Sequence, residues 1–291
     1  MAGIVCQLLL TYLGANFYFM RKHFFLAVIG LLLTGTVLAQ GATYYYNEGI
    51  KLKDDKKYKE ALTSFKKASS LNPKYKEAFY EAGWCSNELE QYDEALTLLN
   101  KANALWPNQA KIYFEMGYAN EQLDNYEQAA EQFKKAISLY EDYPLAYKEL
   151  GNVYFFQKEF KKALDFYQSY ADKEPNIKSA TYYYRRGYCE NDLDKIDDAI
   201  TSLEKAIELD PEYTKAYTEL GYAYYTKENY SQALTELNTG LGIEKTQLAL
   251  YYKGLVYVAQ SKKSDAMDIY RQLQDMKSDY AEKLKKKIDL L

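Results

Sequence analysis

Residues 144–177, PLAYKELGNVYFFQKEFKKALDFYQSYADKEPNI, decide the fold. Position 8 of this stretch is glycine and position 20 is alanine, and both recur in register along the chain. The glycine column is Gly49, Gly83, Gly117, Gly151, Gly187, Gly221 and Gly254, and the alanine column is Ala61, Ala95, Ala129, Ala163, Ala199, Ala233 and Ala266. The glycines follow one another at 34, 34, 34, 36, 34 and 33 residues. A fixed period of this length indicates a stack of similar units that share their apolar cores.

Each unit is predicted to be a helix, a turn and a second helix. A third column of small residues follows the alanines by seven positions, at Ala68, Ala102, Ala136, Ala206 and Gly240. Small residues at these spacings allow two helices to approach to about 8–10 Å. Prolines that would stop the second helix close four of the units, at Pro73, Pro107, Pro175 and Pro211.

The unit resembles the tetratricopeptide repeat, whose signature is Trp-x2-Leu-Gly-x2-Tyr, then Ala-x3-Phe, Ala and Pro. The signature columns of the quoted stretch hold Tyr147, Leu150, Gly151, Tyr154, Ala163, Tyr167 and Pro175. The resemblance covers residues 42–277 and implies an all-α, right-handed superhelical solenoid of stacked helix-turn-helix repeats. Seven repeats are expected, starting near residues 42, 76, 110, 144, 180, 214 and 247. Residues 278–291 place apolar residues between lysines and are expected to form a C-terminal capping helix.

The amino-terminal region predicts export. MRKH at 20–23 precedes an apolar run at 24–38, which ends in the small-residue site VLA at 37–39. This order is typical of a signal peptide, here residues 20–39, and the run is shorter than the roughly 20 residues of a bilayer span. We expect a periplasmic or secreted protein that begins at Gln40 and has no stable membrane insertion after cleavage.

Residues 1–19 carry no charge and are expected to be a misassigned upstream start. The alternative is a membrane-anchored form that keeps its amino-terminal segment. Cleavage would remove Arg21 and Lys22 and no acid, so the formal net charge would change from −4 to −6. A mildly acidic chain argues against a nucleic-acid partner.

The residues that common enzymes need are missing. The single histidine, His23, would leave with the signal peptide, so the mature chain has no histidine for a catalytic relay or for metal binding. The sequence contains neither of the glycine-rich phosphate-binding motifs Gly-x-x-x-x-Gly-Lys-Ser/Thr and Gly-x-Gly-x-x-Gly. We expect no enzymatic activity, no cofactor and no metal. Cys85 and Cys189 lie three repeats apart and are expected to be buried free thiols.

Aromatic residues mark a binding face. At about 100° per residue, repeat positions 2, 5, 9 and 12 lie opposite the core stripe of the first helix. In tetratricopeptide proteins that face lines the concave groove, and the resemblance implies the same here. The candidate groove rings are Tyr46, Tyr80, Phe114, Tyr184 and Tyr251 at position 5, Trp84, Tyr118, Tyr188 and Tyr222 at position 9, and Phe155 and Tyr225 at position 12. Packing of these rings against the adjacent repeat is the other interpretation.

Four polar residues, Lys148, Asn152, Arg185 and Lys215, interrupt a row of glutamates at position 6 of the same helices. Three of them match columns with which some family members clamp a peptide carboxylate, whereas Arg185 and the acid Glu219 depart from that pattern. A coincidental surface cluster is the other interpretation, and we favour it.

The sequence therefore predicts an exported, non-enzymatic scaffold that binds a protein or peptide segment in an aromatic groove, as a cell-envelope adaptor. The alternative is a carbohydrate-binding component of an envelope uptake or polysaccharide system, because tyrosine and tryptophan faces flanked by glutamate and asparagine also suit glycans.

Overall fold

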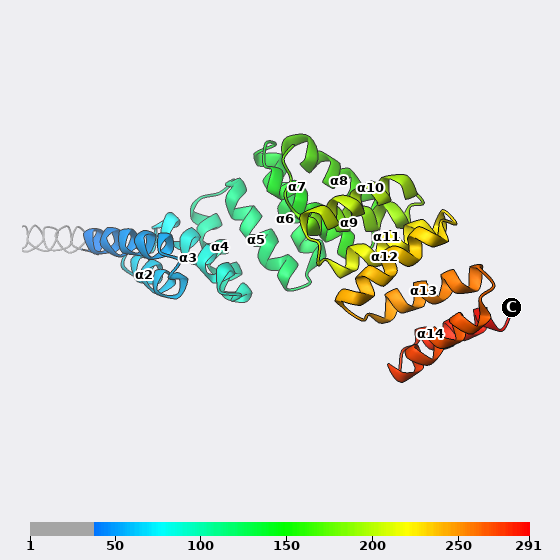
Figure 1. Cartoon of the computed structure of the whole chain (residues 1–291). Helices are drawn as coiled ribbons and strands as arrows, with labels where there is room; N and C mark the ends of the chain where they lie inside the picture. Colours follow the sequence, from blue (N-terminus) through cyan, green and yellow to red (C-terminus); the bar gives the residue numbers. More distant parts are fainter. Residues whose placement is uncertain (1–37) are drawn as a thin grey trace, which may run out of the picture. The chain divides into compact units, whose positions relative to one another are not determined.

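The computed structural model describes residues 38–291, and all regular secondary structure in that range is α-helical (Figure 1). The predicted all-α class is confirmed. Residues 1–37, which hold the expected upstream segment and nearly all of the expected signal peptide, lie outside the described residues. Between residues 38 and 291, no helix is both long and apolar enough to cross a bilayer. The chain divides after Asp124 into two compact units, which are described separately.

The first unit contains two complete helix pairs and one further helix. A helix over residues 38–54 is followed by α2 (Tyr58–Leu71), α3 (Lys76–Glu88), α4 (Tyr92–Leu105) and α5 (Ala110–Gln122). Helix α3 packs against both α2 and α4, and α5 packs against α4 and α3. The core between the pairs is built from small and large apolar residues together, such as Ala61 with Phe65 and Ala95 with Leu99.

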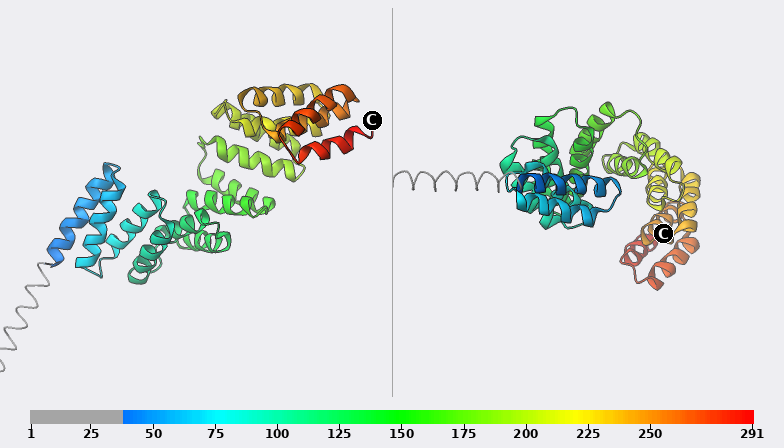
Figure 2. Two further views of the ribbon diagram at one scale, coloured as in Figure 1. Left: turned by 90° about the horizontal axis from the view of Figure 1, so that it is seen from below. Right: turned by 90° about the vertical axis from the view of Figure 1, so that its left-hand side faces the viewer.

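The second unit begins with α6 (Tyr126–Leu139), α7 (Pro144–Phe156), α8 (Phe160–Lys173), α9 (Ala180–Asp192) and α10 (Ile196–Leu209). It continues with α11 (Thr214–Thr226), α12 (Tyr230–Ile243), α13 (Gln247–Ala259), α14 (Lys263–Asp275) and α15 (Tyr280–Ile288). Figure 2 shows these helices stacked in chain order. The first helices of successive repeats also contact one another, α7 with α9, α9 with α11 and α11 with α13, and α15 covers α13 and α14. A shared first-helix face therefore runs through the unit.

The glycine column sets the distance between the two helices of a repeat. A Cβ atom added at Gly187 would lie 2.6 Å from Leu203, and one at Gly221 would lie 2.5 Å from Leu237. A Cβ atom essentially never lies this close to a carbon of another side chain, so the position favours glycine. In the last repeat the equivalent Cβ at Gly254 would meet Leu284 of α15 at 2.5 Å. The capping helix thus closes on the same glycine surface.

The turn inside each repeat contains one left-handed residue, and none of these is glycine. The residues are Lys56, Glu90, Asp124, Lys158, Asp194, Glu228 and Ser261, with φ between 57° and 60°. Around Glu90, the Glu90 amide donates to the Asn87 carbonyl at 3.0 Å and the Gln91 amide donates to the Ser86 carbonyl at 2.8 Å. These two bonds form a Schellman motif, which ends a helix and usually has glycine at the left-handed position. The sharp reversal is kept although a side chain is present.

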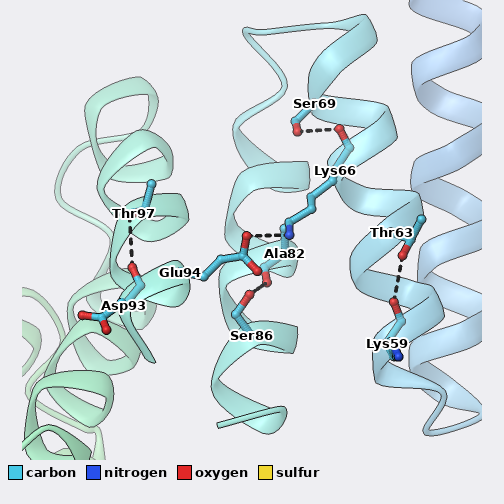
Figure 3. Close-up of polar contacts among 9 residues, drawn as sticks. All are labelled: Lys59, Thr63, Lys66, Ser69, Ala82, Ser86, Asp93, Glu94 and Thr97. Carbon is cyan, nitrogen blue, oxygen red and sulfur yellow. Dashed lines mark hydrogen bonds and ion pairs between the residues drawn. The ribbon is translucent and has the colours of Figure 1, made fainter. Parts of the chain in front are cut away.

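The second helices present polar surface. In the first unit, Lys66 of α2 forms an ion pair with Glu94 of α4 at 2.5 Å (Figure 3). The hydroxyls of Thr63 and Thr97 donate to the backbone carbonyls four residues earlier on the same two helices. Exposed contacts of this kind contribute at most about 1 kcal/mol each. They mark a solvated face and distinguish it from the aromatic first-helix face.

Candidate functional site

The eleven candidate groove rings are all half-buried, and none of them is fully covered or fully exposed. Each ring therefore packs part of its surface inside the unit and leaves part of it accessible. The two interpretations made from the sequence, groove lining and packing between repeats, describe different parts of the same side chains.

The packing part is a recurrent contact between consecutive repeats. In the first unit, the ring of Tyr58 meets the ring of Trp84 edge-on, with centroids 5.5 Å apart. In the second unit, Phe160 meets Tyr188 in the same way at 5.5 Å. In both pairs the ring that opens a second helix touches the position 9 ring of the next repeat. Edge-to-face pairs of this kind stabilise a fold by roughly 0.5–1.5 kcal/mol beyond their buried area.

Lysines cover several rings of the first unit. Lys111 lies over Tyr80, 4.1 Å from the ring centroid, and Lys53 lies over Trp84 at 5.0 Å. Lys53 also forms an ion pair with Glu81 at 2.6 Å. Tyr46 is 5.0 Å from the ring of Tyr75, which precedes α3. The remaining candidate rings of this unit are Phe114 and Tyr118 of α5, both half-buried. On the first-helix face of the first unit, lysine side chains of the chain itself therefore already cover the rings of Tyr80 and Trp84.

The four polar candidates occupy three separate settings. Lys148 pairs with Glu149 at 2.7 Å, and the Asn152 amide donates to the same carboxylate at 2.6 Å. The Arg185 guanidinium lies 4.9 Å from the centroid of Phe156 and 5.7 Å from that of Phe155. Lys215 is exposed on α11. The structure therefore brings Lys148 and Asn152 together on an acid and places Arg185 on aromatic rings.

Tyrosines of α9, α11 and α13 form the aromatic face of the second unit. The ring centroids of Tyr184 and Tyr188 lie 6.3 Å apart on α9. The ring centroids of Tyr222 and Tyr225 also lie 6.3 Å apart, on α11. Tyr222 also stacks on Tyr252 of α13, with centroids 4.8 Å apart.

The end of this face includes a ring from the capping helix. Tyr251 of α13 stacks on Tyr280 of α15 at 4.8 Å. Neither Tyr280 nor Tyr252 was a candidate from the sequence, since they lie outside repeat positions 2, 5, 9 and 12. We use the name tyrosine face for the set Tyr184, Tyr188, Tyr222, Tyr225, Tyr251, Tyr252 and Tyr280.

A cavity of about 220 Å³ opens beside the tyrosine face, within the second unit. It is lined by Tyr184 of α9, by Lys215, Thr218 and Glu219 of α11, and by Thr246 and Leu248 at the start of α13. Thr218 stands at position 5, where the neighbouring first helices α9 and α13 carry Tyr184 and Tyr251. The small side chain leaves room that a ring would fill. The sequence shows that position 5 holds a threonine here instead of a ring. The sequence analysis selected only aromatic residues at this position, so it did not include Thr218 among the candidates.

Glu219 is one of the residues that line the cavity and is 4% exposed. The Asn191 side-chain amide donates to the Glu219 backbone carbonyl at 3.1 Å and, weakly, to its carboxylate at 3.4 Å. Burial raises the pKa of the Glu219 carboxyl to about 7, against the opposing effect of the Asn191 hydrogen bond. In the first unit Glu115 repeats the arrangement with Asn87, whose amide donates to the carboxylate at 2.8 Å. Burial raises the pKa of Glu115 to about 7 as well.

The two cysteines behave as expected from the sequence. Cys85 and Cys189 are both buried and free. Burial raises the pKa of each thiol to about 12, with neighbouring acids acting in the same direction. Such thiols stay protonated at neutral pH and are poor nucleophiles.

Comparison with known families agrees with the repeat architecture. Models described as "Tetratricopeptide repeat" match residues 52–115, 114–176, 214–247 and 248–275, and one described as "TPR repeat" matches residues 187–228. Together the matches span residues 52–176 and 187–275. The chain belongs to the tetratricopeptide repeat family.

Curated relatives match over part of their length. The chain is 34% identical over 145 residues to "DnaJ homolog subfamily C member 7" of Homo sapiens, covering 48% of this chain and 29% of that protein. It is 30% identical over 129 residues to the "Hsp70-Hsp90 organizing protein" of Triticum aestivum, covering 44% and 22%. The chain thus spans about a quarter of the length of these two relatives.

Solved structures share the fold. YrrB, described as a tetratricopeptide protein with an unusual peptide-binding site, superposes with a TM-score of 0.59 at 24% identity, over 65% of this chain and 97% of YrrB. The C-terminal part of a repeat protein from Cytophaga hutchinsonii superposes with a TM-score of 0.62 at 16% identity, over 82% and 98%. MamA from Desulfovibrio magneticus RS-1 superposes with a TM-score of 0.54 at 23% identity, over 58% of this chain and 95% of MamA.

Proposed function

We propose that the chain is a non-enzymatic interaction scaffold that binds a peptide or protein segment on the tyrosine face of its second unit. The observation that carries the proposal is the cavity of about 220 Å³ beside half-buried tyrosines, where Thr218 replaces a ring. A cavity beside the tyrosine face can accept a side chain of a bound peptide. A continuous layer of rings without a cavity would be explained by packing between repeats alone.

Tyrosine suits this role because its ring offers a large contact area and has few rotatable bonds. Tyrosine and tryptophan are accordingly enriched among residues that dominate binding energy in protein interfaces. The stacked pairs of Tyr222 with Tyr252 and of Tyr251 with Tyr280 hold four rings in place before any partner arrives. Preorganised rings lose little entropy on binding. The peptide-binding description of YrrB, a protein with the same fold, supports the same use of the repeats.

Export and a cell-envelope adaptor role are part of the proposal. They rest on residues 20–39, where a basic segment, an apolar run and a small-residue site follow one another. Amino-terminal sequencing of protein recovered from the envelope fraction tests this part. A mature chain that starts at Gln40 supports it, and a chain that keeps residue 20 or earlier contradicts it.

Peptide binding is tested by selection from a displayed library of random twelve-residue peptides on the immobilised full chain. We expect enriched peptides whose affinity falls about tenfold or more in Tyr222→Ala. Tyr140→Ala is the matched control, because Tyr140 is a 54% exposed tyrosine that follows α6 and is not part of the tyrosine face. Equal loss in both variants, or no enriched peptide, would contradict the proposal. Binding to an immobilised glycan panel in the absence of peptide would instead favour the carbohydrate alternative.

A further inference from the structure

The glutamates at position 6 differ in how their carboxylates are satisfied. Glu81 has Lys53 at 2.6 Å, and Glu149 has Lys148 at 2.7 Å. Glu115 accepts a hydrogen bond of 2.8 Å from Asn87. Glu219, by contrast, accepts a hydrogen bond of 3.4 Å from Asn191. Among these four acids, Glu219 has the longest contact and lies in the lining of the cavity.

A buried carboxylate without a cation is unfavourable, because desolvation weakens the charged form and a neighbouring cation would restore it. The exposed Lys215 lies one helical turn before Glu219 on α11 and lines the same cavity. No ion pair within 4.0 Å joins these two residues in the described part of the chain. The cavity lining therefore includes an acid that has no cation within ion-pair distance in the described part of the chain.

The surroundings of Glu219 favour a cation with an apolar stem. The Tyr184 ring and Leu248 line the cavity. Burial raises the pKa of Tyr184 and of Tyr252, and the negative charge of Glu219 acts in the same direction on both hydroxyls. Aromatic rings attract cations through their electron-rich faces, by roughly 0.5–2 kcal/mol.

We infer that the cavity lined by Thr218 and Glu219 is a subsite for one basic side chain, lysine or arginine, of the peptide that the tyrosine face binds. The aliphatic stem lies along Tyr184 and Leu248, and the charged end pairs with the Glu219 carboxylate. The cavity volume of about 220 Å³ gives room for one long side chain. The inference rests on the proposed function, since it names the side chain that a bound peptide presents.

The test compares peptides selected from the same twelve-residue random library by the full-length wild-type chain and by Glu219→Gln. Glutamine keeps an acceptor for Asn191 and removes the charge. The wild type is expected to enrich lysine or arginine at one peptide position. Glu219→Gln is expected to bind peptides through the tyrosine face but to lose that enrichment, and to bind a wild-type-selected peptide at least tenfold more weakly.

Glu115→Gln is the matched control. Glu115 occupies the same repeat position, is buried to a similar extent and also accepts a hydrogen bond from an asparagine 28 residues earlier, but it lies in the first unit. It is expected to keep both the affinity and the lysine or arginine enrichment.

Thr218→Tyr provides a second approach, because it places in the cavity the ring that α9 and α13 carry at this position. We expect it to remove the enrichment while the thermal midpoint stays within a few degrees of the wild type. Lys215→Ala separates basic side-chain binding from carboxylate capture. Removal of a like charge should leave or raise the affinity for a basic peptide, whereas a carboxylate clamp would lose affinity.

Enriched peptides without a preferred lysine or arginine would overturn the subsite while the proposed function stands. The same enrichment in the wild type and in Glu219→Gln would also overturn it. Selection of no peptide at all would overturn the proposed function and the subsite together.

Discussion

The ring of Tyr92 meets the ring of Tyr118 edge-on, with centroids 6.3 Å apart and an angle of 73° between the planes. Tyr92 opens α4, and Tyr118 lies on α5 of the next repeat. The sequence analysis names Tyr118, but not Tyr92, as a candidate groove ring. Since the two rings touch, a position 9 ring serves both the repeat interface and the binding face, and loss of such a ring changes stability and affinity together.

This contact predicts energetic coupling between Tyr92 and Tyr118. Tyr92→Ala and Tyr118→Ala should each lower the free energy of unfolding, and the double variant should lose less than the sum. The expected coupling is about 0.5–1.5 kcal/mol, the range for aromatic pairs in edge contact. Urea unfolding of the four chains measures it. Additivity to within about 0.3 kcal/mol would show that the two rings act independently.

The glycine column predicts overpacking. Gly187→Ala adds a methyl group that would lie 2.6 Å from Leu203, so we expect a loss of about 1–3 kcal/mol in the free energy of unfolding. The double variant with Leu203→Ala should lose less than the sum of the two single losses, because alanine removes the atoms that oppose the added methyl group. Gly242→Ala is the control, since no atom lies within 4 Å of its added Cβ. Chemical denaturation of all variants measures the effect, and an equal loss at Gly242 would be inconsistent with this explanation.

The left-handed turn residues predict a stabilising substitution to glycine. Lys158 has φ 60°, a conformation that costs about 1–2 kcal/mol with a side chain and much less for glycine. After subtraction of the extra flexibility of glycine in the unfolded chain, Lys158→Gly should raise the free energy of unfolding by up to about 1 kcal/mol. Glu131→Gly, at an exposed position inside α6, should lower it by roughly 1 kcal/mol. Thermal unfolding should show opposite shifts, and a decrease at Lys158 would contradict the prediction.

The buried acids predict a pH-dependent stability. Burial raises the pKa of Glu115 and Glu219 from 4.5 to about 7, so the folded state favours their protonated forms. Their contribution to stability is present in full below about pH 4.5 and is lost as the pH rises through 7. Glutamine mimics the protonated form, so Glu115→Gln and Glu219→Gln should match the wild type near pH 5 and exceed it near pH 8, each by up to roughly 3 kcal/mol.

Urea unfolding at pH 5 and pH 8 measures this difference. Glu131→Gln, an exposed acid on α6, serves as the control and should show no such divergence. A constant difference between wild type and variants across this pH range would mean that the two carboxyls keep ordinary pKa values.

The repeat architecture could be predicted because the close contact between the two helices of a repeat favours glycine at one fixed position. Gly187 faces Leu203 with no space for a Cβ, and the same contact recurs between Gly221 and Leu237. A column of glycines at fixed spacing therefore indicates where the two helices of each repeat come into contact. The half-buried rings could be predicted in the same way, since positions 5, 9 and 12 share one side of a helix.

Other features depend on contacts between repeats that no single window of sequence displays. Asn191 reaches Glu219 across 28 residues of sequence, and the same separation joins Asn87 to Glu115. The cavity was missed because it arises from a small residue, Thr218, at a position where rings were sought. The left-handed turns were missed because residues such as Lys158 carry no glycine signal.

The proposed function places a bound peptide on the tyrosine face of the second unit. A library-selected peptide that carries a photoreactive phenylalanine, cross-linked to the full-length chain and located by mass spectrometry, tests it most directly. We predict attachment within α9, α11 and α13, close to Thr218, and competition by the unlabelled peptide. Attachment confined to the second helices α10, α12 and α14 would contradict the claim.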